Sequence, residues 1–144
     1  MRLDATAVSI LHAIFAMGLL SFLMAAWMSV ARDIAMRKAG LNLEAFAHTR
    51  DVAGRMPSWA RRASDNYNHL FEAPTVFYAV ALAIVVGGIA DPLYAGCAWT
   101  FLGLRAVHSL VQATVNRVAS RAAAYALSWI PLTVMIVRPL LTIQ

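Results

Sequence analysis

The sequence has a single cysteine and few charged residues. Cys97 alone allows no disulfide within the chain and no cysteine-based metal cluster. Charged residues make up 13% of the 144 positions and hydrophobic residues 61%, whereas a soluble domain has about 25% and about 45–50%. The mean hydropathy of +0.66 agrees with this imbalance. Low charge and high apolar content predict a membrane protein, and the length suits one domain, residues 1–144.

The chain carries an excess of positive charge, but the excess does not indicate nucleic-acid binding. The net charge is +5, from 12 lysines and arginines against seven acidic residues. Seven of the basic residues lie between positions 32 and 62. A local concentration of this kind is typical of a loop beside a membrane surface. We therefore expect membrane lipids as partners, and no nucleic acid.

Long apolar stretches organise the chain. Residues 6–31 carry no formal charge over 26 positions, enough for a helix to cross a hydrocarbon core of about 30 Å. Further apolar runs cover residues 73–90, 93–104 and 122–137, without a strand-like alternation. We therefore predict an all-α fold, an integral membrane four-helix bundle. The expected helices are about 5–32, 62–90, 93–117 and 121–138, with a loop at about 33–61.

The distribution of basic residues predicts the orientation of this bundle. The 33–61 loop is basic and the short 117–121 connection carries two arginines, but the 91–92 turn carries no lysine or arginine. Because basic loops tend to stay in the cytoplasm, we expect the 33–61 loop to be cytoplasmic and both termini to lie outside. In a bacterium, a multi-pass protein of this kind would lie in the inner membrane.

Polar residues occur within or at the edge of the apolar helices. An ionisable group near the centre of a membrane helix costs at least about 2.5–3.5 kcal/mol, so such groups face the bundle interior, a partner subunit or water. Here they recur every three or four positions, which places them on shared helix faces. They are Arg62, Asn66, His69 and Glu72 on the second helix, Arg105, His108 and Gln112 on the third, and Arg121 and Tyr125 on the fourth.

These three polar stripes lie near the same membrane face, because the second helix enters where the third leaves and the fourth begins. An interhelical ion pair, such as Glu72 with Arg105, is one interpretation of any two of the residues. The set as a whole favours a binding site, and its excess of arginine over carboxylate predicts an anionic ligand. No two histidines have metal-ligand spacing, so we expect no metal.

Two segments of the chain resemble the MAPEG family, the membrane-associated proteins in eicosanoid and glutathione metabolism, and in particular its bacterial-type members. The segments read DNYNHLFEAPTVFYAVALA and LRAVHSLVQATVNRVASRAAAYALSWIP. The resemblance implies a homotrimer of four-helix subunits. It also implies that glutathione, the co-substrate, binds between neighbouring subunits near the cytoplasmic side.

The resemblance also assigns roles on the second and third helices. Glu72 matches the glutamate of a family motif, and His69 stands where the family has an asparagine, for which Asn66 one turn earlier could substitute. Arg105 and His108 match an arginine and a histidine that are separated by two residues in the family. Two further positions complete this part of the glutathione-binding shell: Gln112, where some members have a tyrosine, and Arg62.

On the fourth helix, Arg121 matches the arginine that stabilises the glutathione thiolate in the family, so it is the expected catalytic residue. Tyr125 matches a ligand-binding tyrosine. Ala122 replaces a serine found in some members, which excludes a mechanism that needs this hydroxyl. The first helix would contribute Arg32 or Arg37, and the sequence does not choose between them.

The resemblance therefore favours an enzyme: a membrane-bound glutathione-dependent transferase or peroxidase that attacks a lipophilic electrophile or hydroperoxide. The residues agree, because glutathione has two carboxylates and one ammonium, and a guanidinium lowers the pKa of a thiol from about 8.5. The alternative is a non-enzymatic lipid-binding or scaffold protein of the same fold, which the departures at His69, Gln112 and Ala122 favour.

Overall fold

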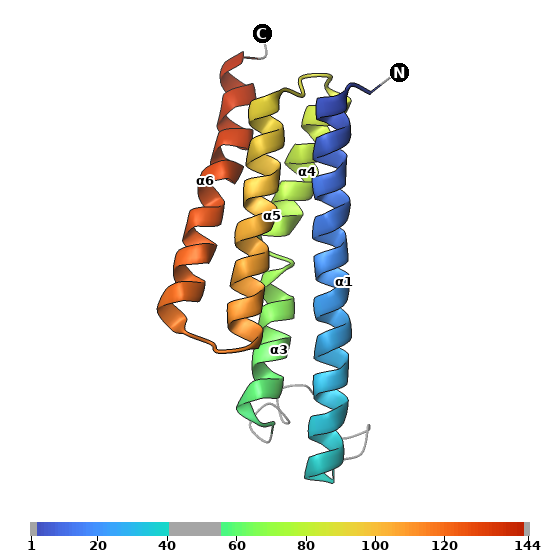
Figure 1. Cartoon of the computed structure of the whole chain (residues 1–144), viewed down its shortest axis with the longest axis vertical. Coiled ribbons are helices and arrows are strands. Elements are labelled where there is room, and N and C mark those ends of the chain that lie inside the picture. The colour runs from blue at the N-terminus through green and yellow to red at the C-terminus, as the bar shows by residue number, and fades with distance from the viewer. Residues whose placement is uncertain (1–2, 41–55, 143–144) are drawn as a thin grey trace.

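The computed structural model describes residues 3–40 and 56–142, and these residues form helices joined by short connections (Figure 1). The helices are α1 (Ala5–Ala39), α3 (Ser58–His69), α4 (Ala73–Val86), α5 (Pro92–Ala113) and α6 (Val118–Thr142). Helices α3 and α4 follow each other end to end and together form the second of four helical rods. The predicted all-α four-helix bundle is confirmed.

The helices pack as a bundle with both ends of the described chain on one side. Helix α5 packs against α6, α1 and α3, and α1 packs against α3, α4 and α5. Figure 1 shows the first residues of α1, the last residues of α6 and the α4–α5 turn at one end of the molecule. The α5–α6 connection and the start of α3 lie toward the other end.

The outward surface of the bundle is apolar, as a membrane requires. The described residues contain three helical stretches that are long and apolar enough to span a bilayer: Ala5–Ala39, Ser58–Val86 and Val118–Thr142. Large hydrophobic side chains such as Phe15 and Leu140 are 70% and 76% exposed, a surface that lipid rather than water would cover. Helix α5 is not among these three stretches, and it carries most of the buried polar side chains of the described residues.

The hydrophobic core fills the half of the bundle nearer the chain ends. The rings of Phe77 and Phe101 stack there with centroids 4.6 Å apart, and Ile10, Leu132 and Met135 are fully buried around them. Small buried alanines on α1, α4 and α5 allow the backbones to approach closely. The core thus holds four rods together at one end and leaves the other half of the bundle to polar side chains.

The first helix is longer than expected. It continues past residue 32 to Ala39 and ends at Gly40, whose φ of 63° is readily adopted only by glycine. Arg37 pairs with Asp33 one turn earlier at 2.9 Å, which supports the extra helical turns. The loop expected at about 33–61 therefore begins later, and its residues 41–55 lie outside the described part of the chain.

The second helix is interrupted, whereas the sequence predicted one helix over about 62–90. Helix α3 ends at His69 and α4 begins at Ala73, with Pro74 in its first turn. Proline has no N–H to donate and disfavours helical backbone at the preceding residue, so Pro74 favours a break just before it. The break lies beside the polar residues of α5 and α6, and it shapes the site described below.

Asp91 joins the α4–α5 turn to α6. Its Oδ1 accepts a hydrogen bond from the Tyr94 N–H at 3.0 Å and so caps α5, and its Oδ2 accepts one from Arg138. Arg138 also lies over the Tyr94 ring, 4.7 Å from its centroid. Burial raises the pKa of Asp91, but these hydrogen bonds from Tyr94 and Arg138 outweigh it and hold the pKa below its usual value.

We predict that Asp91→Ala lowers the free energy of unfolding by about 1–2 kcal/mol at neutral pH, because it removes the cap and the ion pair. Asp91→Asn keeps the cap and loses about 1 kcal/mol at most. Because folding lowers the pKa of Asp91, its contribution is complete above the unfolded pKa of about 3.9 and disappears as the pH falls through the folded value. Thermal unfolding in detergent, followed by circular dichroism at neutral and acidic pH, measures this. Equal stability of the alanine variant and the wild type at neutral pH would contradict it.

Candidate functional site

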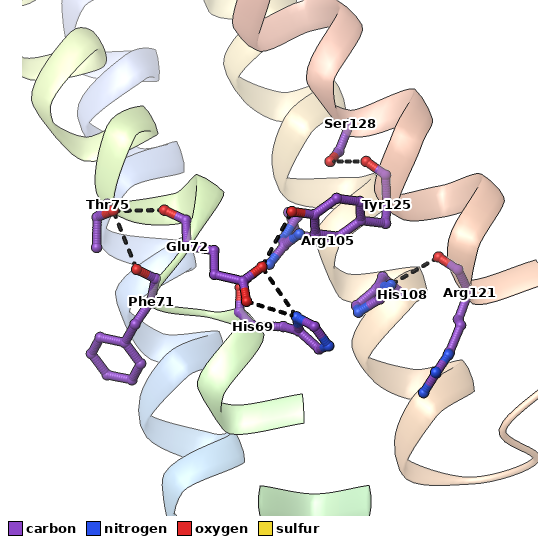
Figure 2. A network of polar contacts seen from close by, with 9 residues as sticks. All are labelled: His69, Phe71, Glu72, Thr75, Arg105, His108, Arg121, Tyr125 and Ser128. Carbon is purple, nitrogen blue, oxygen red and sulfur yellow. Dashed lines mark hydrogen bonds and ion pairs between the residues drawn. The ribbon is translucent and has the colours of Figure 1, made fainter. Parts of the chain in front are cut away.

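Polar side chains from three helices meet beside the break in the second rod, and Glu72 is at their centre (Figure 2). Both carboxylate oxygens of Glu72 accept from His69 Nδ1, each at 3.1 Å, and one also accepts from the Tyr125 hydroxyl at 3.2 Å. We call His69, Glu72, Arg105, His108 and Tyr125 the polar cluster. It unites the end of α3, the α3–α4 break, α5 and α6.

The break between α3 and α4 supplies two further contacts, both to backbone carbonyls. Glu72 lies outside both helices, with φ −90° and ψ −102°, and the Thr75 hydroxyl donates to its carbonyl at 2.6 Å. Since α3 ends at His69, the carbonyl of His69 lacks a helical partner, and Arg105 Nη2 donates to it. A continuous helix would have occupied this carbonyl.

Arg105 is fully buried, and its hydrogen bonds are incomplete. Its guanidinium lies 5.2 Å from the centroid of the Tyr125 ring, while Nε and Nη1 have no partner among the described residues. The ion pair with Glu72 that the sequence allowed is not formed in this part of the chain, because Glu72 accepts from His69 and Tyr125 instead. A buried cation with open donors is costly unless an anion or water completes it.

His108 connects α5 to α6. Its Nδ1 donates to the Arg121 carbonyl at 2.9 Å, and its ring centroid lies 5.7 Å from those of His69 and Tyr125. The side chain is buried, and its Nε2 has no partner among the described residues. His108 therefore offers a buried acceptor next to the open donors of Arg105.

Arg121, the expected catalytic residue, points away from Glu72 and toward the α5–α6 connection (Figure 2). Its Nη1 donates to Asn116 Oδ1 at 3.0 Å. Arg121 also lines a cavity of about 230 Å³, the site cavity. The other lining residues are Asp65, Asn68, His69 and Gln112. His69 therefore belongs to both the polar cluster and the cavity wall on which Arg121 lies.

Three more of the sequence-predicted residues extend the site with open polar atoms. Asn66 and Gln112 are fully buried, and neither amide has a partner among the described residues. The buried Nε of Arg62 also has no hydrogen-bond partner among the described residues. The stripe predicted on one helix face is correct for Arg62, Asn66 and His69, but Glu72 lies beyond the end of that helix. It reaches His69 across the break rather than along a helix face.

The first-helix arginines differ in their surroundings. The side chain of Arg37 is 79% exposed and pairs with Asp33, whereas Arg32 is half-buried. Arg32 is thus the better placed of the two to face the bundle. The described residues contain no group of three histidine, cysteine, aspartate or glutamate side chains that could hold a metal ion.

Sequence reasoning missed two residues of this region. Ser109 is fully buried with an unpartnered hydroxyl, and its position four residues after Arg105 places both on one helix face. Asn116 holds the Arg121 side chain and has a φ of 49°, in the left-handed region that asparagine tolerates better than most residues. The helical spacing and the turn position were the signals that could have indicated them.

The fold and the site together define an integral membrane helical bundle with a buried polar site. The sequence profile of the MAPEG family matches residues 10–141, nearly the whole chain. The chain belongs to this family, which supports a glutathione-related membrane function in general terms. No protein of curated function and no solved structure gives a significant match to the chain.

We predict that Arg105 serves ligand binding at little benefit to stability. Arg105→Met removes the buried charge at similar volume and should change the free energy of unfolding by about 1 kcal/mol or less. Arg105→Ala leaves a cavity as well and should cost about 2–4 kcal/mol. Thermal unfolding of the detergent-solubilised variants without ligand compares them. A methionine variant as unstable as the alanine variant would show that Arg105 mainly holds the helices together.

Proposed function

We propose that the protein is a glutathione-dependent membrane transferase or peroxidase. The observation that carries this proposal is the fully buried Arg105, whose open donors lie within the polar cluster of a MAPEG family member. An internal guanidinium with unused hydrogen bonds suits an anionic ligand, and glutathione is the anion to which this family is linked.

The charges of the site suit those of glutathione. The tripeptide has two carboxylates, for which Arg105 and Arg62 offer open nitrogens. It has one ammonium, for which the polar cluster offers the carboxylate of Glu72. The remaining proposed binding residues supply neutral donors and acceptors: Asn66, His69, His108, Gln112 and Tyr125. These groups would fix the position of the thiol.

Arg121 is the proposed catalytic residue. A thiol has a pKa of about 8.5, and a guanidinium beside it favours the thiolate, the nucleophilic form. Arg121 already lies on the wall of the site cavity, so its charge can reach a ligand there. The thiolate then attacks an electrophilic carbon or the peroxide oxygen of a lipophilic substrate. Such a substrate would reach the site from the bilayer that surrounds the apolar outer faces.

The proposal includes assembly as a homotrimer, a single MAPEG-like domain and a fixed orientation. The site cavity is open on one side of the single chain, and a neighbouring subunit could close it. The basic loop between α1 and α3 would face the cytoplasm, and both termini would lie outside.

The proposal predicts that Arg121→Ala lowers kcat for conjugation of glutathione to an electrophilic aryl halide by about 10²-fold or more, because a preorganised charge at the reacting sulfur is lost. Arg121→Lys should retain part of the activity. Arg61→Ala, a change of an exposed arginine outside the site, is the matched control. An Arg121→Ala variant with full activity would disprove the catalytic assignment.

A non-enzymatic lipid-binding protein is the second candidate function. Helices α4 and α6 form an apolar groove of about 270 Å³, lined by residues such as Ile84, Met135 and Leu140. An acyl chain could occupy a groove of this composition. The departures from the family pattern at His69 and Gln112 agree with a protein that no longer uses glutathione.

Calorimetric titration separates the two functions. We expect saturable binding of glutathione to the detergent-solubilised wild type and weaker binding to Arg105→Met, which has lost the buried cation. Absence of saturable glutathione binding by the wild type, together with binding of a long-chain fatty acid, would favour the lipid-binding function instead.

A further inference from the structure

We propose that His69, oriented by Glu72, is the general base that removes the proton from the glutathione thiol. The inference rests on the proposed function and adds a reaction step to it. The resemblance to the MAPEG family implies an asparagine at this position, and an amide cannot take up a proton at neutral pH. The proposed role therefore belongs to this chain's own residue.

The hydrogen bonds define which nitrogen of His69 can act as a base. An ionised carboxylate only accepts hydrogen bonds, so the contacts of 3.1 Å to Glu72 place the proton on Nδ1. The other nitrogen, Nε2, then carries a lone pair. A carboxylate that holds one side of an imidazole fixes its tautomer and stabilises the imidazolium that forms when the other side accepts a proton.

The pair of His69 and Glu72 is supported on both sides. The Tyr125 hydroxyl donates to Glu72 at 3.2 Å, and Arg105 donates to the His69 carbonyl, so neither partner depends on the other alone for its position. The side chains of His69 and Glu72 are 36% and 49% exposed in the single chain. The base is therefore accessible to a ligand that enters the site cavity.

The site cavity brings the base and the cation to the same ligand. His69 and Arg121 both line this space of about 230 Å³. A thiol inside it can give its proton to His69 while the resulting thiolate is stabilised by Arg121. The two residues thus have separate roles, because His69 accepts the proton and Arg121 lowers the energy of the anion.

His108 is the rival base, and the structure favours His69. His108 has the same tautomer, but its Nδ1 donates to the neutral carbonyl of Arg121, which stabilises an imidazolium less than a carboxylate does. His108 is 3% exposed and does not line the site cavity. A proton taken up there would have no direct route to water.

The proton and the electron pairs balance in this step. The S–H bond of glutathione breaks, its proton moves to His69 Nε2, and the sulfur keeps the electron pair. This pair forms the new bond to the electrophilic carbon of an aryl halide, and the halide leaves with the electrons of the bond that breaks. The imidazolium then gives its proton to water.

Other charges also act on His69 and contribute to its pH profile. On its own helix these are Arg62 and Asp65, and Glu72 follows at the break. Helix α5 contributes Arg105 and His108, and α6 contributes Arg121 and Tyr125. Helix α1, which packs against α3, carries the half-buried Arg32. Among all these groups, His69 is the one that combines a place on the cavity wall with a carboxylate partner.

The test is the pH dependence of conjugation to an aryl halide by the wild type, His69→Asn and Glu72→Gln, with His12→Asn as the matched histidine control on α1. We expect His69→Asn to lower kcat by about 10²-fold near neutral pH, as is typical for loss of a general base. The deficit should shrink toward the thiol pKa of about 8.5, because the thiolate then forms without a base. The kcat of Glu72→Gln should lie between those of the wild type and His69→Asn, and the kcat of His12→Asn should match that of the wild type.

Chemical rescue distinguishes a base from a structural histidine. Added imidazole should restore part of the activity of His69→Ala, which has space for it, and none of the activity of Arg121→Ala. Gel filtration and circular dichroism establish that each variant is folded. If the His69 variants are not folded, the pH profile of Glu72→Gln tests the proposal instead. Loss of this carboxylate should lower activity most near neutral pH.

The outcomes separate the role of His69 from the proposed function. Wild-type turnover with an unchanged pH profile in His69→Asn would overturn the role of His69 and leave the proposed function intact. A rise in KM for glutathione with unchanged kcat would also overturn it, because that result indicates binding alone. Absence of both glutathione binding and turnover in the wild type would overturn the two together.

Discussion

The polar site depends on the break in the second membrane rod, which Pro74 favours in the first turn of α4. The break leaves the His69 carbonyl without a helical partner, and Arg105 binds it. It also turns Glu72 out of the helix, where its carboxylate meets both His69 and Tyr125. The local break thereby supplies the contacts that join three helices.

Arg105 illustrates how the bundle balances stability against function. Half of the interior is packed by apolar residues such as Phe77 and Phe101, which hold the helices together without polar contacts. That core allows the other half to contain a buried guanidinium, although desolvation of such a charge is costly. A protein selected for stability alone would gain little from this residue, so a ligand is the better explanation of its presence.

The sequence predicted the rods and the gathering of polar residues, but not their pairing. Uncharged runs locate membrane helices because lipid leaves a helix no other way to satisfy its backbone. A spacing of three or four residues correctly placed Arg62, Asn66 and His69 on one helix face. The same spacing brings His69 and Glu72 together, but it could not show that Glu72 lies beyond the end of the helix and also accepts from Tyr125, because periodicity assumes an unbroken helix. The end of the first helix at Gly40 was missed for a related reason: charged residues suggested a loop, although helices continue readily into water.

The two central arginines are held in different ways, and this difference bears on their roles. Arg105 is enclosed, with its guanidinium over the Tyr125 ring and one nitrogen on the His69 carbonyl. Arg121 lies at the cavity wall, where its side chain donates to Asn116 and its carbonyl accepts from His108. An enclosed cation can position a ligand but cannot follow it, whereas a cation at the wall can adjust to a sulfur whose charge changes during reaction. In the proposed mechanism the base comes from the same wall, because among the residues that line the cavity His69 alone has both a lone pair and a carboxylate to stabilise its charged form.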